Sequence, residues 1–351
     1  MPINIDGSKG IRQNTTEVTK IPVGTTAQRP ANPEAGMIRF NTDNGQVEGY
    51  DPALDGWRAI NQSFAESVIA TGGTVTDITQ DGQLFRVHTF TSDGTFEVTR
   101  GGEVEYLVVA GGGAGGAACG NGGGGGGGAG GYRSSVTNEP SGGGASSEPK
   151  FTVTANTYSV VVGAGGSNVS GSNTVGNDGS DSQFANITSI GGGGGGVHQD
   201  NSARDGGSGG GSGGFVNDSG RVGGAGTTGQ GFRGADGAYA GAGGASERGQ
   251  SGFEDGTRGN GGDGVESSID GSATFRAGGG GGANRTTTPV PPSADGAGGF
   301  GGAGGGGDGS EGNDDNGLPG AANTGGGGGG TRCGTSGAGG SGIVIVRYRI
   351  G

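Results

Sequence analysis

The sequence is poor in the side chains that build a hydrophobic core, and it is poor in positive charge. Only 28% of the 351 residues are hydrophobic and 5% are aromatic, whereas an average globular chain has about 45–50% apolar residues when glycine is counted with them. A conventional core can therefore form in only part of the chain. The net charge is −13, from 33 acidic residues against 20 Lys and Arg, and this excludes the basic surface that nucleic-acid binding requires.

Long apolar runs are also missing. No stretch approaches the ~20 apolar residues that span a bilayer, so we expect no membrane insertion. The first residues, Met1 to Asp6, have neither the basic region nor the apolar stretch of a signal peptide. We therefore expect a protein that acts inside a cell or leaves it by lysis, as virus particle proteins do.

Cysteine and histidine, the residues of many catalytic and metal sites, are nearly absent. Cys119 and Cys333 cannot make a disulfide framework or a four-ligand zinc site. We expect two unpaired thiols in a reducing cell; a single bridge is the alternative if their segments lie side by side. His88 and His198 lie 110 positions apart, and no nucleophile or metal motif accompanies them. The sequence thus predicts no enzyme activity, no metal and no cofactor.

Glycine is what the chain has in abundance. Only eleven of its 99 glycines lie in the first hundred residues, and the rest include uninterrupted runs such as 122–128 and 325–330. Gly, Ala or Ser recurs at every third position from Gly231 to Gly252. Three residues per turn is the period of a polyproline II helix, which has no internal hydrogen bonds. Such helices, made of glycine, can pack backbone against backbone, so we predict a bundle of polyglycine II helices.

Collagen and flexible linkers are also rich in glycine. Collagen is rejected, because it needs an unbroken repeat and much proline, whereas this chain has 11 prolines and its glycine runs break the phase. A flexible, low-complexity linker is the remaining alternative to the bundle. The period of three and the strand-like runs on either side of the glycine favour the bundle.

The first 83 residues are predicted to be an attachment region. Residues 1–20 are predicted to be a polar arm, 21–60 a small β-module, and 61–83 a Thr-rich linker with a possible helical turn at 65–70. Asn44-Gly45 lies between two apolar runs, which indicates a β-hairpin. A module of this size is marginal alone, so we expect it to oligomerise.

Residues 84–351 are predicted to be a glycine-rich β-sandwich. Strand-like runs occur at 84–110, 151–154, 158–162 and 184–190, and the chain closes with Ile343–Tyr348. Because these runs bracket the glycine, we expect the first and last strands to meet and a polyglycine bundle (101–342) to be inserted between them. The predicted fold class is all-β.

Side chains interrupt the glycine at intervals, and these interruptions are predicted to be loops between helices. Loops on a rigid scaffold often carry recognition, and aromatic residues beside Arg, Asn and Asp suit sugars or polar polymers. The alternative is that the aromatics seal helix ends and the polar residues form solvated turns. A calcium ion at 313–317 is disfavoured, because the EF-hand spacing is absent. The candidate binding residues are His198, Phe215, Phe232, Arg233, Tyr239, Arg285, Pro289, Asp314 and Asp315.

Two stretches resemble known proteins. The segments Ile21–Pro30, Gly36–Asn41 and Gly56–Ile60 resemble a small β-module of bacteriophage tail-fibre and virion appendage proteins. The segments Glu105–Gly113, Tyr158–Gly166 and Gly342–Tyr348 resemble glycine-rich domains of marine phage structural proteins. They are similar, more loosely, to the tip adhesins of T-even-like phages, in which polyglycine II helices display host-binding loops.

The resemblance implies a virion structural protein, a tail fibre or tip adhesin that binds the host surface. Its expected partners are other virion proteins through residues 1–60, two further copies in a homotrimer, and a host polysaccharide or outer-membrane protein. The alternatives are a head fibre or decoration protein on the capsid, and a cellular ice- or surface-binding protein. The last would need a flat face of repeated Thr or Ala, which the sequence lacks.

Overall fold

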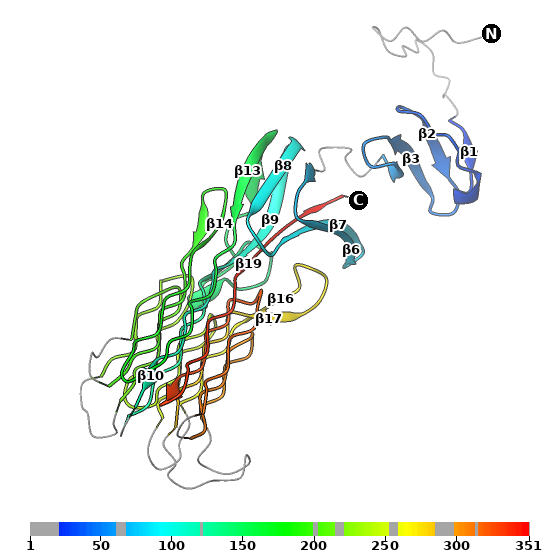
Figure 1. The fold of residues 1–351 in the computed structure, drawn as a ribbon. Helices are drawn as coiled ribbons and strands as arrows, with labels where there is room; N and C mark the ends of the chain where they lie inside the picture. Colours follow the sequence, from blue (N-terminus) through cyan, green and yellow to red (C-terminus); the bar gives the residue numbers. More distant parts are fainter. Residues whose placement is uncertain are drawn as a thin grey trace, which may run out of the picture. The chain divides into compact units, whose positions relative to one another are not determined.

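A computed structural model gives the fold of the chain (Figure 1) and describes residues 21–60, 68–119, 122–198, 203–214, 221–252, 259–284, 298–312 and 315–350. The chain divides into two compact units between Glu66 and Ser67. Within the described residues the fold is all-β, as the sequence predicts. Helical structure there is limited to two 3-10 turns, η1 (Thr26–Gln28) and η2 (Gly142–Gly144).

The first unit contains a four-stranded sheet in the order β1-β2-β3-β4. Strands β2, β3 and β4 pair antiparallel, and β1 joins β2 in parallel. The β2–β3 turn includes Gly45, whose φ of 69° lies in the left-handed region. The strand bounds are β1 (Val23–Gly24), β2 (Ile38–Asn41), β3 (Gln46–Asp51) and β4 (Gly56–Ala59).

The side chains that this first unit buries are polar. Glu48 is 1% exposed and accepts hydrogen bonds from Arg29 Nη2 at 2.6 Å and Asn41 Nδ2 at 3.1 Å. Arg39, which is directly opposite Glu48 in the β2–β3 pair, lies 3.3 Å from it. The hydrogen bond from Arg29 is the main reason that the pKa of Glu48 is lowered. Apolar residues of the same sheet, such as Ile38, are exposed instead.

The second unit contains two larger sheets. One has the order β11-β9-β19-β7-β6, with β12 also pairing with β9, and the other has the order β15-β14-β13-β8-β5. The strands are β5 (Ile69–Thr71), β6 (Thr74–Gln80), β7 (Gln83–Phe90), β8 (Gly94–Arg100), β9 (Gly102–Val109), β11 (Tyr132–Ser134), β12 (Phe151–Val153), β13 (Asn156–Val161), β14 (Ser182–Phe184), β15 (Ile187–Ser189) and β19 (Ile343–Arg349). Strand β19 lies between β7 and β9, so the end of the chain pairs with strands that precede the glycine-rich region.

These two sheets share one hydrophobic core. Phe96 and Phe184 of one sheet pack in the same buried cluster as Tyr106, Val344 and Tyr348 of the other. A second cluster lies on the opposite face of the larger sheet and combines Leu107 and Ile345 with Tyr132 and with Ala245 and Ala277 of the glycine-rich region. The sheets are therefore packed against the glycine-rich segments by ordinary apolar contacts.

His88 is a buried polar group in the first of these cores. Its Nδ1 donates to the Gly72 carbonyl at 2.7 Å, which leaves Nε2 to accept from the Tyr348 hydroxyl at 3.1 Å. Burial is the main cause that lowers the pKa of His88, and the bond to Gly72 opposes it in part. We conclude that His88 is structural, as its place in a strand pattern predicts.

Extended glycine-rich segments fill the rest of the second unit, between residues 110 and 342, and run side by side in Figure 1. We call them the glycine bundle. Their backbone groups bond from segment to segment, and every third residue returns to the same neighbour. The segment 111–117 shows the pattern. Its N–H groups at 111, 114 and 117 donate to the carbonyls of residues 180, 177 and 174, which belong to one neighbour. Those at 112 and 115 donate to residues 340 and 337 of a second neighbour, and those at 113 and 116 to residues 128 and 125 of a third.

The segment 124–131 repeats this arrangement. Its N–H groups at 124, 127 and 130 donate to the carbonyls of residues 331, 328 and 325. Those at 125, 128 and 131 donate to a second neighbour, at residues 196, 193 and 190. Those at 126 and 129 donate to a third neighbour, at residues 240 and 243. The donor-to-acceptor distances are 2.8–3.1 Å. Each segment thus bonds to three neighbours in turn, and buried backbone groups are satisfied without a ladder between paired strands.

Direct backbone contact explains why these positions are glycine. A Cβ atom added to Gly126 would lie 2.0 Å from the Gly280 carbonyl oxygen, and one added to Gly327 would lie 1.8 Å from that of Gly127. Real Cβ atoms essentially never come within 3.0 Å of another heavy atom. Any side chain at such a position would push two segments apart.

The structure corrects three details of the sequence prediction. The expected linker 61–83 contains strands β5 and β6, which belong to the second unit. Ile69 and Ala70 of the expected helical turn are in strand β5, and residues 61–67 lie outside the described part. The three-residue phase from Gly231 to Gly252 is not one continuous segment, because turns and bends interrupt it at 237–239 and 245–247. Gly237 has no atom within 4 Å of an added Cβ, and its requirement for glycine comes from a φ of 96°.

Candidate binding surface

The glycine bundle has two unlike ends. The larger sheets lie at one end, and the two-residue strands β10 (Ala117–Ala118) and β18 (Thr331–Arg332) lie at the other, which we call the distal end (Figure 1). Strands β10 and β18 pair in parallel. Contacts bring other parts of the chain close to these strands: a Cβ added to Gly122 would lie 3.3 Å from the Cβ of His198, and the Gly214 N–H donates to the Gly123 carbonyl at 3.0 Å. The distal end therefore gathers described residues from several distant parts of the glycine-rich region.

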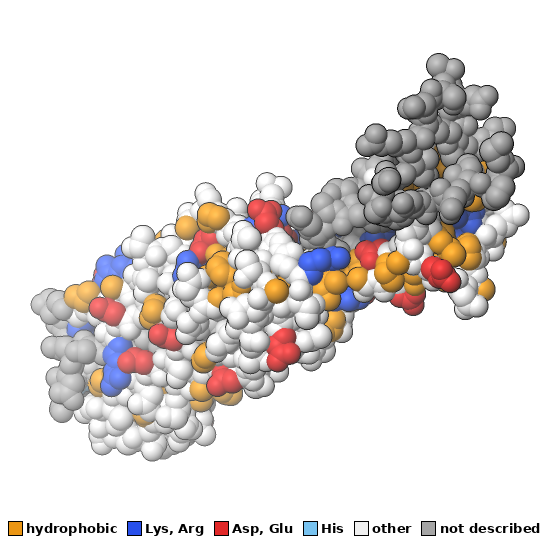
Figure 2. All heavy atoms as spheres, turned by 90° about the horizontal axis from the view of Figure 1, so that it is seen from above, with side chains coloured by type: hydrophobic (Ala, Val, Ile, Leu, Met, Phe, Trp, Pro, Cys, Tyr) orange, Lys and Arg blue, Asp and Glu red, His pale blue; other side chains and the backbone are white. Residues whose placement is uncertain are grey.

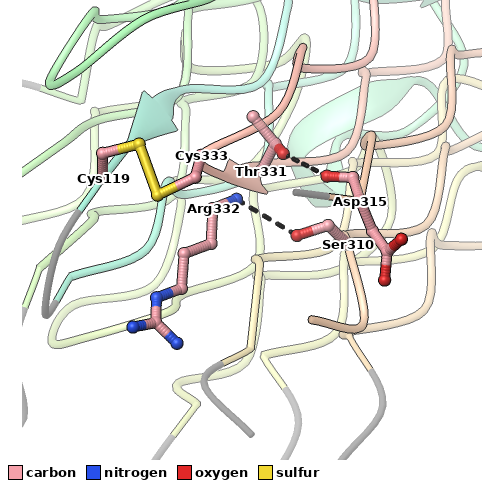
Figure 3. The surroundings of a disulfide bond; sticks show 6 residues. All are labelled: Cys119, Ser310, Asp315, Thr331, Arg332 and Cys333. Carbon is pink, nitrogen blue, oxygen red and sulfur yellow. Dashed lines mark hydrogen bonds between the residues drawn. A yellow bond between two sulfur atoms is a disulfide. The ribbon is translucent and has the colours of Figure 1, made fainter. Parts of the chain in front are cut away.

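A disulfide bond joins Cys119 and Cys333 directly after β10 and β18 (Figure 3). The two Cα atoms are 4.5 Å apart, and 214 positions separate the residues in sequence. The expectation of two unpaired thiols is therefore wrong. The thiols meet because the bundle brings the beginning and the end of the glycine-rich region into adjacent segments, which sequence separation alone does not reveal.

Polar contacts continue this cross-linking beside the disulfide. The Thr331 hydroxyl donates to the Asp315 carbonyl at 2.6 Å, and the Arg332 backbone N–H donates to the Ser310 hydroxyl at 3.1 Å. In Figure 3 the Arg332 guanidinium points away from the disulfide. The candidate residue Asp315 is exposed, so its carboxylate is available at the distal end.

His198 takes part in a second set of polar contacts at the same end. Nη2 of the Arg221 guanidinium lies 2.9 Å from Nδ1 of His198. Its Nη1 donates to the carbonyls of Val197 at 3.2 Å and Gly213 at 2.7 Å. Arg221 thus holds together two segment ends and fixes the imidazole beside them. No sequence pattern marks Arg221 as a site residue, because it stands alone among glycines without a motif.

Tyr239 does not lie on the surface. It is 1% exposed, has a left-handed φ of 51°, and its ring would be 2.6 Å from a Cβ at Gly123. The ring fills space within the bundle beside Gly123, near the distal end. We therefore leave Tyr239 out of the candidate surface.

Phe232 lies away from the distal end, whereas Arg233 lies near the Arg221 contacts. The half-buried Phe232 ring lies 3.5 Å from a Cβ added to Gly144 of η2, beside the sheets. Arg233 pairs with Asp236, which also pairs with Arg248 at 2.8 Å, and all three side chains are 38–47% exposed. This surface ion-pair network is close to Arg221, because Asp236 also accepts from the Gly223 N–H at 2.9 Å and the Gly237 N–H donates to the Arg221 carbonyl at 3.4 Å.

The remaining candidates, Phe215, Arg285, Pro289 and Asp314, lie outside the described residues. Two of their described neighbours, Gly214 and Asn284, are at the distal end: Gly214 bonds to Gly123, and Asn284 to Ser310.

Charges on the described surface are scattered. On the face shown in Figure 2, acidic and basic side chains alternate singly over the second unit and no patch of one sign dominates. Within the described residues no group of three His, Cys, Asp or Glu side chains could hold a metal ion. Among these same residues, no helix has the length and apolar character needed to cross a membrane.

The comparison with known families decides what kind of chain this is. Residues 89–349, about three quarters of the sequence, match the glycine-rich domain family. This chain belongs to the glycine-rich domain family. The match begins in β7 and ends in β19, so it covers the whole glycine bundle and both larger sheets except β5, β6 and most of β7. No curated protein matches the sequence.

Proposed function

We propose that this protein is an external appendage protein of a bacteriophage virion, a tail fibre or tip adhesin, and that it binds the host surface through the distal end. The observation that carries the proposal is the glycine bundle itself. Backbone bonding with a period of three supports a bundle of polyglycine II helices on a β-sandwich. Such a bundle is a rigid support that holds several chain segments at one end.

Rigidity matters for a receptor-binding role. A binding surface made of several separate segments loses less entropy on association when its scaffold already holds them in place. The disulfide and the Arg221 contacts fix segment ends at the distal end and so support this role. The function proposed is recognition rather than catalysis, with a host polysaccharide or outer-membrane protein as the target.

Adsorption to host cells tests the proposal. Residues 285–293, which include Arg285 and Pro289, are replaced by a Gly/Ser sequence of equal length, which leaves Asn284 and its bond to Ser310 in place. We expect weaker adsorption with unchanged thermal unfolding. Asp81→Asn, in the β6–β7 turn at the sheets, is the control and should adsorb normally. Normal adsorption after replacing this segment, and then each other distal segment in turn, would refute receptor binding.

We also propose that the first unit assembles the protein as a homotrimer and attaches it to other virion proteins. Its sheet leaves an apolar face uncovered: Val23, Ile38 and Val47 are 67%, 46% and 37% exposed. Strand register places Val23, Phe40 and Val47 side by side, with Ile38 two residues from Phe40 on the same face. A unit that buries only polar side chains needs a partner over such a face.

The mass of the full chain in solution tests this assembly. Ile38→Glu should convert a trimer to a monomer, because it places a charge in the covered face. Val75→Glu, in β6 of the second unit, is a matched control, since Val75 is also 46% exposed. A monomeric wild-type chain, or a trimer that tolerates Ile38→Glu, would refute assembly through this face.

A further inference from the structure

A groove lies on the second unit, away from the distal end. It runs between the turn that follows β11 and the hairpin of β16 (Val265–Ser267) and β17 (Thr274–Arg276). Its volume is about 520 Å³, which is within the ~300–1,000 Å³ of typical ligand clefts. The side chains that define its chemistry are Asn138, Glu139, Glu266, Ser268 and Phe275.

An aromatic ring forms one wall of the groove. Phe275 is 44% exposed, and it is directly opposite Glu266 in the β16–β17 pair. Val265, Ser267 and Arg276 of the same hairpin are buried, so Phe275 and Glu266 both project outward. A phenyl ring kept in water beside a carboxylate offers an apolar face and a hydrogen-bond acceptor within one site.

Glu139 also lines the groove and is held in a fixed position. One of its carboxylate oxygens accepts bonds from the Ser268 backbone N–H at 2.9 Å and the Ser268 hydroxyl at 2.6 Å, and the other accepts from the Ser267 hydroxyl. Each carboxylate oxygen can accept two bonds, so the oxygen bonded to Ser267 retains acceptor capacity. Beside it, Asn138 is exposed, and its φ of 66° reflects the tight turn that carries its amide to the rim.

We propose that this groove binds a neutral pyranose unit of a surface polysaccharide. A pyranose ring has an apolar C–H face that can stack on Phe275 and hydroxyl groups that can donate to Glu139 and Glu266. Asn138 supplies both a donor and an acceptor. The described residues that line the groove include two carboxylates and no Lys or Arg, so acidic sugars are disfavoured. The site rests on the proposed host-binding function and adds a lateral contact to the distal end.

Binding of defined oligosaccharides by the purified full chain tests the site. The probes are gluco-, galacto- and manno-oligosaccharides, with hexuronic acid oligosaccharides for comparison. We expect at least one neutral series to bind and Phe275→Ala to weaken it about tenfold, the loss expected for one aromatic stacking contact. Phe300→Ala is the matched control, because Phe300 is 53% exposed on another part of the unit, and it should leave affinity unchanged.

The possible results separate this site from the proposed function. Failure of every neutral oligosaccharide to bind, binding of the acidic series only, or equal affinity of Phe275→Ala and wild type would overturn the groove as a sugar site. Adsorption of particles that carry Phe275→Ala is measured separately. Because the distal segments are intact in this variant, host binding can be retained while sugar binding by the groove is lost.

Discussion

Gly127 offers a direct way to perturb the backbone packing of the glycine bundle. Its N–H donates to the Gly328 carbonyl at 2.8 Å, and its own carbonyl accepts from Gly280 at 2.9 Å. A Cβ at this position would lie 2.2 Å from the Gly113 carbonyl oxygen. Gly127→Ala therefore adds a single methyl group where three other segments meet the backbone.

The expected loss of stability follows from these distances. For the added Cβ to lie 3.0 Å from the Gly113 oxygen, the two segments must separate by about 0.8 Å. This separation lengthens hydrogen bonds of 2.8–2.9 Å beyond the normal range for a hydrogen bond. Losing three or four such bonds costs about 3–4 kcal/mol. Alanine also reduces the conformational entropy of the unfolded chain, and this stabilises the folded state by up to about 1 kcal/mol. The net destabilisation is about 2–3 kcal/mol, or about 3–6 °C in Tm for a unit of this size.

Calorimetric unfolding of the full chain measures this effect. Gly312→Ala is the control, because the nearest atom to its added Cβ is a flexible Asp315 side-chain oxygen at 3.2 Å, and its Tm should change by less than about 2 °C. If Gly127→Ala unfolds at the same temperature as wild type and Gly312→Ala, the segments are not packed backbone against backbone and the reasoning fails.

Three further predictions concern the second unit. Reduction, or Cys119→Ser with Cys333→Ser, should lower the stability by up to about 5 kcal/mol, because the bridge closes a very long loop; an unchanged Tm would contradict a stabilising bridge. Tyr239→Ala should cost about 3–5 kcal/mol because it empties a buried site, and full stability would mean that the ring is not packed. The lowered pKa of His88 keeps it neutral when folded, so the unfolded state binds more protons and stability should fall as the pH drops from about 7 to 5, by at most about 1.4 kcal/mol per pH unit. His88→Phe should remove this slope in calorimetry, and a persistent slope would assign it to other groups.

Strands with apolar side chains could be predicted from the sequence. The run at Val104–Ala110 corresponds to β9, and the closing run at Ile343–Tyr348 corresponds to β19. These β-branched residues form strands because they pack on a pleated, buried surface. Strand β6 falls in the predicted linker, because Thr74–Gln80 is largely exposed and has no apolar alternation to reveal it.

The arrangement of the glycine bundle could not be predicted in detail. A period of three suggests the kind of segment, but neighbouring glycines are chemically identical and encode no choice of partner. Which segments meet is decided by turns, as at Tyr239, and by the few contacts that fix segment ends. For the same reason the pairing of Cys119 with Cys333 and the contact between Arg221 and His198 appear only in the folded chain.

Amide hydrogen exchange across residues 124–131 tests the central claim most directly. Every N–H in this segment donates to a carbonyl of another segment, including those of Thr331, Gly196 and Ala240. A cooperatively packed glycine bundle predicts exchange at least about a thousandfold slower than in an unstructured chain, comparable to the exchange in β9. Exchange at the unstructured rate in 124–131, while β9 remains protected, would show that the glycine is a flexible insertion and would contradict the account.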